Sequence, residues 1–334
     1  MIAPAAGILA TGSSVPATEV TNDDLAPRFD VTPDWIERKT MIRSRRYAAQ
    51  GEATSDLAIA AATEALERMG LPAEWLDYVI VATSTPDAPL PPTSCLVQRA
   101  LGAHHAACFD INIACSGFVY ALAVARGLLS SRPGAYALVV GADVWSRFID
   151  PHDRSTTVLL SDGAGAAVLG PVPGPYGIVE TDLISHGELS DLLVVEAGGS
   201  RRPASHETVD EVGHVLRMRG RDVTEFALGT VPQTVKELLA RAGVRAEEID
   251  HFVPHQANGV LLGKLGERLG LDNATTHLTV GEYGNSGAAS MAVTLDHAAR
   301  SGGLKDGELV LLTGFGGGMA VGNCLLRWTT EVTA

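Results

Sequence analysis

The sequence predicts an α/β protein made of two similar halves, and three observations support this fold class. Short apolar runs alternate with stretches of helical periodicity along the chain. Residues 62–81 and 234–253 share one layout: an amphipathic helix, a glycine, an acidic turn, an aspartate and an apolar strand. The glycines of the two copies, Gly70 and Gly243, are 173 positions apart. The chain of 334 residues is long enough for two such halves.

The individual elements follow from the spacing of apolar residues. The apolar start, residues 1–9, is the expected first strand. The other predicted strands are short β-branched or aliphatic runs at 78–82, 137–140, 166–169, 252–253, 309–312 and 324–328. Apolar stripes predict a helix over 57–69 and its repeat over 226–239. Pro232 lies inside the second helix, so we expect a kink or a late start there.

A further helix, after Cys115, is apolar on nearly every side and is therefore expected in the core. Its charge-free stretch, 111–125, is shorter than the roughly 20 residues of a membrane span, which predicts a protein with no membrane partner. Residues 163–177 are rich in glycine and proline and carry no charge. We place the boundary there, which gives halves of 1–172 and 173–334.

Composition excludes several classes of function. The formal net charge is −14 and the pI is near 5.1, so binding of nucleic acid through its phosphates is excluded. The first positive side chain is Arg28, so the apolar start is not a signal peptide. The four cysteines lack Cys-x-x-Cys spacing, which indicates a reducing cytoplasm and argues against a thiolate metal site. Dinucleotide-binding and Walker A motifs are absent from the sequence.

Three polar residues and one glycine run stand where chemistry is expected. Cys115 lies between a predicted strand and the core helix, where the helix dipole lowers the pKa of a thiol. His255 ends the repeated strand, and Asn285 begins an Asn-Ser-Gly turn that repeats Cys-Ser-Gly. Residues 315–318, Phe-Gly-Gly-Gly, allow a backbone amide to approach a reacting carbonyl. Each feature alone fits a core cysteine, a structural histidine or a flexible loop, but together they predict acyl chemistry across a pseudo-twofold axis.

Several motifs give the sequence a specific resemblance. They are Asp34–Arg43 (DWIERKTMIR), Ala114–Phe118 (ACSGF), Asp150–Arg154 (DPHDR) with Ser161–Ala166 (SDGAGA), Val253–Asn258 (VPHQAN), Tyr283–Ser290 (YGNSGAAS) and Gly314–Gly318 (GFGGG). With these motifs over nearly the whole chain, the sequence resembles the thiolase superfamily and, within it, the β-ketoacyl-acyl carrier protein synthase III family. The resemblance implies a thiolase-like five-layered α-β-α-β-α fold from two duplicated halves, and a homodimer.

The resemblance also implies roles for individual residues. Cys115 matches the acylated nucleophile, and His255 and Asn285 match the pair that binds the malonyl thioester carbonyl. The amides of Cys115 and Gly317 fall at the oxyanion hole. Further matches are Trp35, Lys39, Arg154 and Asn258 for binding acyl-CoA or its carrier, and Leu90, Leu160 and Met319 for the acyl pocket, Leu90 being supplied by the partner subunit.

The sequence departs from the family pattern around the expected entrance. Lys39 stands where Arg is often found, Met41 replaces a usual Gly, and Glu225 takes the place of a common Lys. Gly259 and Val260 follow the VPHQAN motif where an Arg is often found. These changes weaken the positive rim for CoA and for an acidic carrier protein, which implies a shifted dock or a donor other than acetyl-CoA.

The predicted function is a decarboxylating condensing enzyme. An acyl primer, from acyl-CoA or acyl carrier protein, is loaded on Cys115, and malonyl-acyl carrier protein extends it to a 3-oxoacyl thioester. The product serves fatty-acid initiation or primer selection in a polyketide or cofactor pathway. Two alternatives stay open: an acyltransferase that passes the acyl group to an alcohol or amine, against which Asn285 argues, and a silent partner subunit. We expect no metal and no cofactor beyond the thioester substrates.

Overall fold

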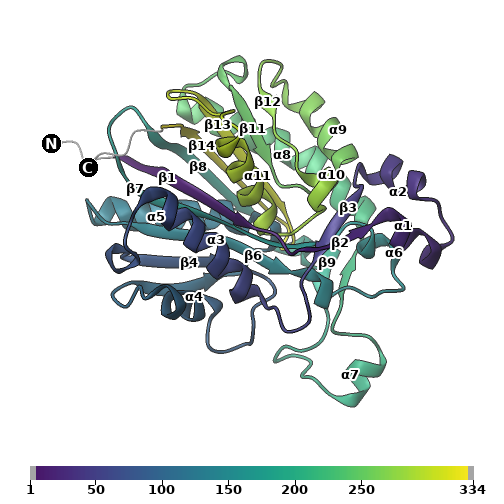
Figure 1. Cartoon of the computed structure of the whole chain (residues 1–334). Coiled ribbons are helices and arrows are strands. Elements are labelled where there is room, and N and C mark those ends of the chain that lie inside the picture. Colours follow the sequence, from purple (N-terminus) through teal and green to yellow (C-terminus); the bar gives the residue numbers. More distant parts are fainter. Residues whose placement is uncertain (1–4, 330–334) are drawn as a thin grey trace.

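Two five-stranded sheets alternate with three layers of helices in the computed structural model, which describes residues 5–329 (Figure 1). The first sheet has the strand order β1-β7-β6-β4-β5 and the second has the order β12-β11-β13-β14-β8. The predicted five-layered α-β-α-β-α architecture is therefore confirmed.

The strands of each sheet come from one part of the chain. The first sheet contains β1 (Ala5–Ser14), β4 (Tyr78–Ala82), β5 (Ala107–Ile111), β6 (Ala137–Val144) and β7 (Asp162–Val172). The second contains β8 (Gly177–Ser185), β11 (His251–Pro254), β12 (Thr275–Thr276), β13 (Leu309–Gly316) and β14 (Ala320–Arg327). In both sheets three neighbouring strands are parallel and the other two complete the sheet by antiparallel pairing. The sequence repeat is thus a repeat of topology.

Three hydrophobic clusters hold the layers together. Helices α3 (Thr54–Met69) and α4 (Thr93–Leu101) pack on the outer face of the first sheet. Helices α8 (Gly220–Ala242) and α9 (Gly259–Leu269) pack on the outer face of the second. Helices α5 (Gly117–Ser131) and α11 (Ala289–Arg300) fill the central layer, where their apolar residues contact strands of both sheets. The helix after Cys115 is therefore a core helix, as its sequence predicted.

Smaller elements complete the chain. They are β2 (Thr18–Thr21), α1 (Asn22–Leu25), α2 (Pro33–Thr40), β3 (Ser44–Tyr47), α6 (Arg154–Thr157), β9 (Leu193–Val195), α7 (His206–Asp210), β10 (Leu216–Met218) and α10 (Val280–Tyr283). Helix α7 stands out from the body of the molecule (Figure 1). Strands β9 and β10 form a separate two-stranded sheet.

Two sequence predictions differ from the structure at their edges. The first strand starts at Ala5 and continues to Ser14, beyond the predicted 1–9, and residues 1–4 lie outside the described range. Helix α8 begins well before Pro232 and continues through it, so the predicted late start is wrong. A proline leaves the carbonyl four residues earlier without its helical partner. Here that carbonyl, of Leu228, accepts a hydrogen bond of 2.8 Å from Arg268 of α9, which compensates for the loss.

The apolar character of the central layer also explains one membrane-like segment. Among the described helices, one stretch, Ala114–Ser131, has the length and apolar composition of a membrane span. Its apolar side chains, including Phe118, Leu122 and Leu129, pack between the two sheets. This composition is therefore what a helix buried on both sides requires.

Candidate active site

Cys115 stands at a tight turn between β5 and α5. One 3-10 turn, Ala114–Ser116, precedes α5, and Cys115 is only 8% exposed. Ala114 adopts a φ of 45°, in the left-handed region that residues other than glycine rarely occupy. Strained turns of this kind persist where the surrounding packing holds them, and they gather at functional sites.

The glycine run of β13 passes directly against this turn. A Cβ atom on Gly316 would lie 2.8 Å from Cβ and 3.0 Å from Sγ of Cys115, so only glycine fits there. The backbone amides of Gly317 and of Cys115 itself donate hydrogen bonds to the cysteine sulfur and lower the pKa of its thiol. The two amides predicted as oxyanion donors thus converge on the Cys115 side chain.

The protonation of Cys115 differs from the sequence prediction. Burial raises the pKa of Cys115 to about 12, and the nearby carboxylate of Asp143 adds to the rise. The hydrogen bonds from the two amides oppose this shift without cancelling it. The prediction of a lowered thiol pKa is therefore wrong, because loss of solvent outweighs the favourable helix end.

Asp143, on β6, is a fully buried carboxylate that sequence reasoning missed. Its oxygens accept hydrogen bonds of 2.8 Å from the amides of Ser84 and Ala288, and two threonine hydroxyls donate to it at 3.2 Å. Burial raises the pKa of Asp143 to about 6 against these hydrogen bonds. Ala288 follows the Asn285 turn, so Asp143 ties that turn to the first sheet. The only sequence signal was a single aspartate within an apolar run.

His255 follows β11 and is 2% exposed. Its Nδ1 atom lies 2.8 Å from the hydroxyl of Ser290 on α11, and its ring meets the ring of Phe315 edge to face at 5.5 Å. Burial lowers the pKa of His255 to about 3. The imidazole is therefore neutral at physiological pH and keeps one nitrogen as a donor.

Asn285 lies on the turn between α10 and α11, and its backbone pairs with the segment before β7. Its amide donates to the carbonyl of Leu159, and its carbonyl accepts from the amide of Ser161, both at 2.9 Å. Its side-chain oxygen accepts from the Gly287 amide at 3.0 Å. Gly287 has a φ of 59°, and a side chain there would collide with Asp143 and Trp145. The glycine of the Asn-Ser-Gly turn is therefore required.

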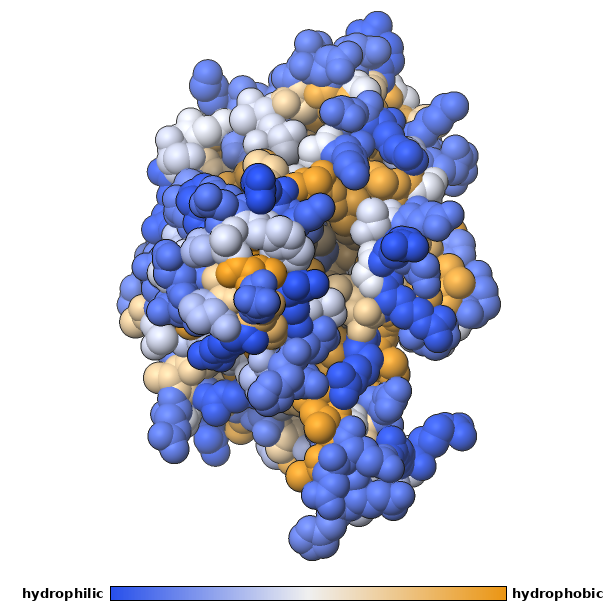
Figure 2. Space-filling model, turned by 90° about the vertical axis from the view of Figure 1, so that its right-hand side faces the viewer, coloured by the Kyte–Doolittle hydropathy of each residue, from blue (hydrophilic) through white to orange (hydrophobic). Residues whose placement is uncertain are grey.

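One cavity of about 350 Å³ brings these groups together, since Cys115, His255 and Asn285 all line it. Lys39 of α2, Asn258 and Lys264 of α9 also line it, and because both lysines are exposed we call this end of the cavity its entrance. Figure 2 shows apolar surface in a hollow between hydrophilic flanks on the side of the molecule that faces right in Figure 1. The structure thus places all three predicted catalytic side chains in a single site.

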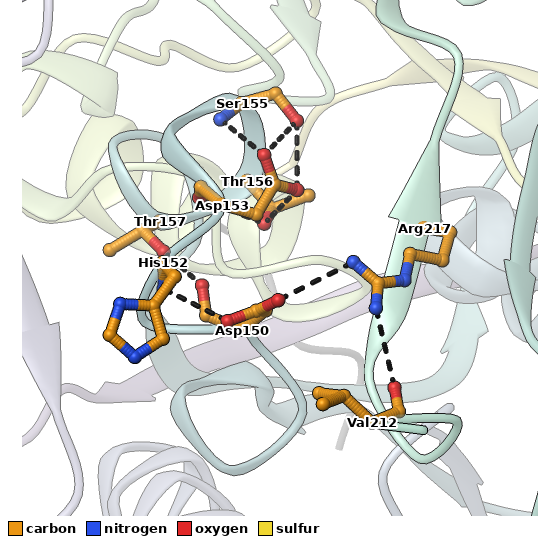
Figure 3. Close-up of polar contacts among 8 residues, drawn as sticks. All are labelled: Asp150, His152, Asp153, Ser155, Thr156, Thr157, Val212 and Arg217. Atoms are coloured by element: carbon orange, nitrogen blue, oxygen red, sulfur yellow. Dashed lines mark hydrogen bonds and ion pairs between the residues drawn. The ribbon is translucent and has the colours of Figure 1, made fainter. Parts of the chain in front are cut away.

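Trp35 and Arg154, two of the residues predicted to bind acyl-CoA or its carrier, contact each other directly. The guanidinium of Arg154 lies over the Trp35 ring, 4.6 Å from its centre. The segment around Arg154 is held by two aspartates (Figure 3). Asp150 accepts from the His152 amide at 2.9 Å and pairs with Arg217 at 3.4 Å. Asp153 accepts from the Ser155 amide at 2.8 Å and caps α6.

The other predicted binding residues lie at the entrance, and one of them has a structural task. Asn258 caps α9, since its side-chain oxygen accepts from the amides of Val260 and Leu261. Its nitrogen donates to the carbonyl of Lys39 at 3.2 Å, which joins α9 to the end of α2.

Two departures from the family pattern explain each other at this entrance. Met41 ends α2 with a φ of 58°, a conformation that favours the glycine usual at this place. A Cβ atom on Gly259 would lie 2.6 Å from Cβ of Met41. The missing side chain at 259 therefore makes room for the extra side chain at 41.

The residues predicted for the acyl pocket are not all in the cavity. Leu160 lines it. Met319 does not: it is fully buried and packs with α8 on the outer side of the second sheet, because the β13–β14 turn directs it there. Leu90 is 79% exposed and lines no described cavity of its own chain. The structure adds Trp145, Leu193 and Leu216 to the lining, and the last two lie on the β9–β10 hairpin.

Known proteins resemble the chain over nearly its full length. The model for 3-oxoacyl-[acyl-carrier-protein] synthase III matches residues 109–187, and the model for its C-terminal part matches residues 239–328. The acetoacetyl CoA synthase NphT7 of Streptomyces sp. strain CL190 is 50% identical over 323 residues, which cover 96% of this chain and 98% of that protein. The β-ketoacyl-[acyl-carrier-protein] synthase III of Caldanaerobacter subterraneus is 44% identical, with 97% and 98% covered. The priming β-ketosynthase of the R1128 polyketide pathway has a TM-score of 0.91 at 34% identity, with 98% of both chains covered.

Proposed function

The chain belongs to the 3-oxoacyl-[acyl-carrier-protein] synthase III family of condensing enzymes, and on that premise we propose that Cys115 accepts an acyl primer which a malonyl thioester then extends. The observation that carries this proposal is the single cavity lined by Cys115, His255 and Asn285, with the glycine run at the cysteine sulfur.

Primer loading is a thioester exchange. The Cys115 sulfur attacks the carbonyl carbon of the primer, and negative charge develops on the carbonyl oxygen. The amides of Cys115 and Gly317, already directed at this point, stabilise that oxygen. The carrier thiol leaves with the proton of the cysteine, so the site returns to neutrality. The raised pKa of Cys115 adds to the cost of removing this proton.

Extension begins with loss of CO2 from the malonyl thioester. The electron pair of the broken C–C bond forms an enolate, whose oxygen needs hydrogen-bond donors. The Ser290 hydroxyl accepts from the Gln256 amide at 3.2 Å and lies 2.8 Å from Nδ1 of His255. In the proposed tautomer the hydroxyl donates to Nδ1, which places the ring proton on Nε2. The Nε2–H group of His255 and the side-chain amide of Asn285 then donate hydrogen bonds to the enolate oxygen. Its carbon attacks the acyl group on Cys115, and the C–S bond breaks. The 3-oxoacyl thioester is released, and the expelled Cys115 thiolate takes a proton from water to restore the thiol.

The extender is expected to be malonyl-acyl carrier protein, because the family is named for a 3-oxoacyl-acyl carrier protein product, and the primer is expected to be an acyl-CoA. The pair of Trp35 and Arg154 supports CoA binding, because an adenine that displaces the guanidinium from the ring can stack on Trp35 and be covered by Arg154. No metal or redox cofactor takes part, since loss of CO2 drives the condensation. The β-ketosynthase activity thus depends on side chains and substrate alone.

We also propose a cytoplasmic homodimer. The four cysteines are free thiols, as in a reducing compartment. Strand β5 is an edge strand of the first sheet, and the exposed Leu90 lies in the connection between β4 and α4, so a second copy has an edge on which to pair. Sedimentation analysis tests this part, and a monomeric mass contradicts it.

The test of the proposed function is intact-protein mass spectrometry of the wild type and of Cys115→Ala with a panel of acyl-CoAs. We expect one acyl group on the wild type and none on the variant. Malonyl-acyl carrier protein and malonyl-CoA are then added separately, and one of them must discharge the acyl group as a 3-oxoacyl thioester. An acyl-enzyme that survives both contradicts decarboxylative condensation and supports transfer to an alcohol or amine.

A further inference from the structure

The side chain of Gln256 is a buried amide just beyond the end of β11. It has no exposed surface, and all four of its hydrogen bonds are made to the backbone. Its nitrogen donates to the carbonyl of Pro254 at 2.8 Å and to the carbonyl of His277 at 3.3 Å. Its oxygen accepts from the amides of Thr279 and Val280 at 2.9 and 3.0 Å. One side chain thus satisfies two buried carbonyls and two buried amides.

These backbone groups belong to the two segments that carry the enolate donors. Pro254 is the last residue of β11, and His255 is the next residue in the chain. Thr279 and Val280 begin α10, a helix of a single turn, and Asn285 is the second residue after its end. A movement of α10 relative to β11 would therefore move Asn285 relative to His255. The side chain of Gln256 opposes that movement, because it bonds to both segments at once.

The backbone around Gln256 also contacts each donor. The amide of Gln256 donates to the Ser290 hydroxyl at 3.2 Å, and the same hydroxyl lies 2.8 Å from Nδ1 of His255. The side-chain nitrogen of Asn285 donates to the carbonyl of Ala257 at 3.4 Å. Gln256 is thus the point at which the surroundings of the two donors meet.

We propose that Gln256 is a positioning residue for the extension step, which holds His255 and Asn285 at the separation that the enolate oxygen requires. The inference rests on the proposed function, because the malonyl-derived enolate is the species that needs both donors. Gln256 does not line the cavity, so it acts through its neighbours and not on the substrate. Primer loading uses Cys115 and its oxyanion amides, which lie on other segments, and so does not depend on this side chain.

Gln256→Met tests the proposal, because methionine is similar in length and volume but forms none of the four hydrogen bonds. Acetyl transfer from acetyl-CoA to Cys115 and discharge of the acetyl group by the malonyl thioester that serves the wild type are measured separately by intact mass. Loading should stay within about threefold of the wild-type rate, and this result also shows that the variant is folded. Discharge should slow by about a hundredfold, the cost of misplacing a catalytic group by about 1 Å.

Gln256→Glu provides a second test, which decides the matter if Gln256→Met does not fold. The protonated carboxyl has one donor and one acceptor, as the amide has, whereas the ionised form has no donor for the two carbonyls. The ratio of the variant to the wild-type discharge rate should therefore rise by about tenfold as the pH falls from 8 to 6.

The titratable groups beside Gln256 do not account for such a rise. Burial lowers the pKa of His255 to about 3 and is the main cause that lowers the pKa of His277 to about 4, so both rings stay neutral between pH 6 and 8. His251, whose Nδ1 atom lies 3.0 Å from Nε2 of His277, and Glu308 beyond it are present in the wild type as well. Their titration therefore cancels in the ratio.

Gln98→Met is the matched control. Its side-chain nitrogen also donates to a backbone carbonyl, that of Ala103 at 2.9 Å, but at the end of α4 and outside the cavity. Loading and discharge should both keep their wild-type rates.

The outcomes distinguish this inference from the proposed function. If the wild type is not acetylated, or if no malonyl thioester discharges it, the proposed function fails. If the wild type completes both steps and Gln256→Met slows loading as much as discharge, or slows neither, the positioning role is overturned. A discharge ratio for Gln256→Glu that stays low at both pH values also overturns it.

Discussion

At the scale of single residues, the site holds Cys115 and His255 in uncharged forms. Burial raises the pKa of Cys115 and lowers that of His255, so thiol and imidazole are both neutral near pH 7. The exception is Asp143, whose pKa of about 6 leaves it ionised at pH 7. Burial is the main cause of the raised pKa of Cys115, and the negative charge of Asp143 raises this pKa further. The carboxylate that fixes the Asn285 turn therefore also tunes the nucleophile.

Asp143→Asn should lower the pKa of the Cys115 thiol and speed its alkylation. The amide keeps the shape of the carboxylate, but removes the charge that disfavours the thiolate. Because alkylation requires the thiolate, the rate of iodoacetamide addition at pH 8, followed by the mass of the Cys115 peptide, should rise by about tenfold for each unit of pKa.

Asp162→Asn is the matched control for this experiment. Asp162 is an equally buried carboxylate whose partners are the Ala48 amide and Ser146, and it contributes nothing to the pKa of Cys115. An alkylation rate that rises equally in both variants, or falls in Asp143→Asn, contradicts the electrostatic role.

At the scale of elements, the site depends on how closely β13 can approach the start of α5. The close approach occurs at Gly316 and Gly314, where added Cβ atoms would meet the Cys115 side chain and the Cα atom of Ser116. The next residue, Gly317, supplies its amide to the cysteine sulfur. The glycines therefore set the distance between the nucleophile and the oxyanion donor. They are required for close packing, whereas a flexible loop would not need glycine at these particular positions.

Gly316→Ala should abolish primer loading, because its methyl group would lie 2.8 Å from Cβ of Cys115 and force the turn away from β13. The measurement is acetyl transfer to Cys115 from acetyl-CoA, where a displaced oxyanion donor costs about a hundredfold or more in rate. Gly263→Ala, inside α9 with open space around the new methyl group, is the control. It should keep full activity and gain about 0.5–1 kcal/mol in the free energy of unfolding. Equal activity of the two variants would rule out a tight fit at Gly316.

At the scale of the whole molecule, a buried carboxylate connects the two halves far from the cavity. Asp296 of α11 has no exposed surface and accepts hydrogen bonds from Thr11 at 2.8 Å and Ser13 at 2.6 Å on β1. Arg68 of α3 and Arg300 of α11 pair with the same carboxylate. The central helix of the second half is therefore anchored to a strand and a helix of the first.

Asp296→Asn should lower the free energy of unfolding by about 2–3 kcal/mol, because it removes the charge from several charge-assisted hydrogen bonds and leaves buried donors imperfectly paired. The measurement is urea denaturation at one protein concentration, followed by fluorescence and circular dichroism. Glu67→Gln, an exposed change on α3, is the control and should stay within about 0.5 kcal/mol of the wild type. An equally small effect of Asp296→Asn would show that the halves are held by apolar packing alone.

The sequence predicted most of the architecture because its signals are local and occur twice. The strands at 78–82 and 309–312 are apolar runs, and repetition of one topology follows from repetition of one pattern. Cys115 and Asn285 were identified because each stands at a strand-to-helix turn or its repeat. Trp145 could not be identified as a residue of the cavity lining, since it lines the cavity together with strands β9 and β10 of the other half. Met319 was wrongly predicted to line the acyl pocket, because a turn rather than a periodic element sets the direction of its side chain. The predicted low pKa of the Cys115 thiol was wrong because burial is a property of the whole fold.

The repeated topology has a consequence for how the two catalytic turns came to differ. Two identical halves related by a twofold axis must carry the same residue at both turns, so a symmetric pair offers two thiols or two amides but never one of each. Once both halves belong to one chain, each turn is encoded separately. Joining the halves in one chain thus allows a nucleophile at Cys115 to face an enolate donor at Asn285. The two turns perform different steps of the reaction although the folds around them are nearly the same.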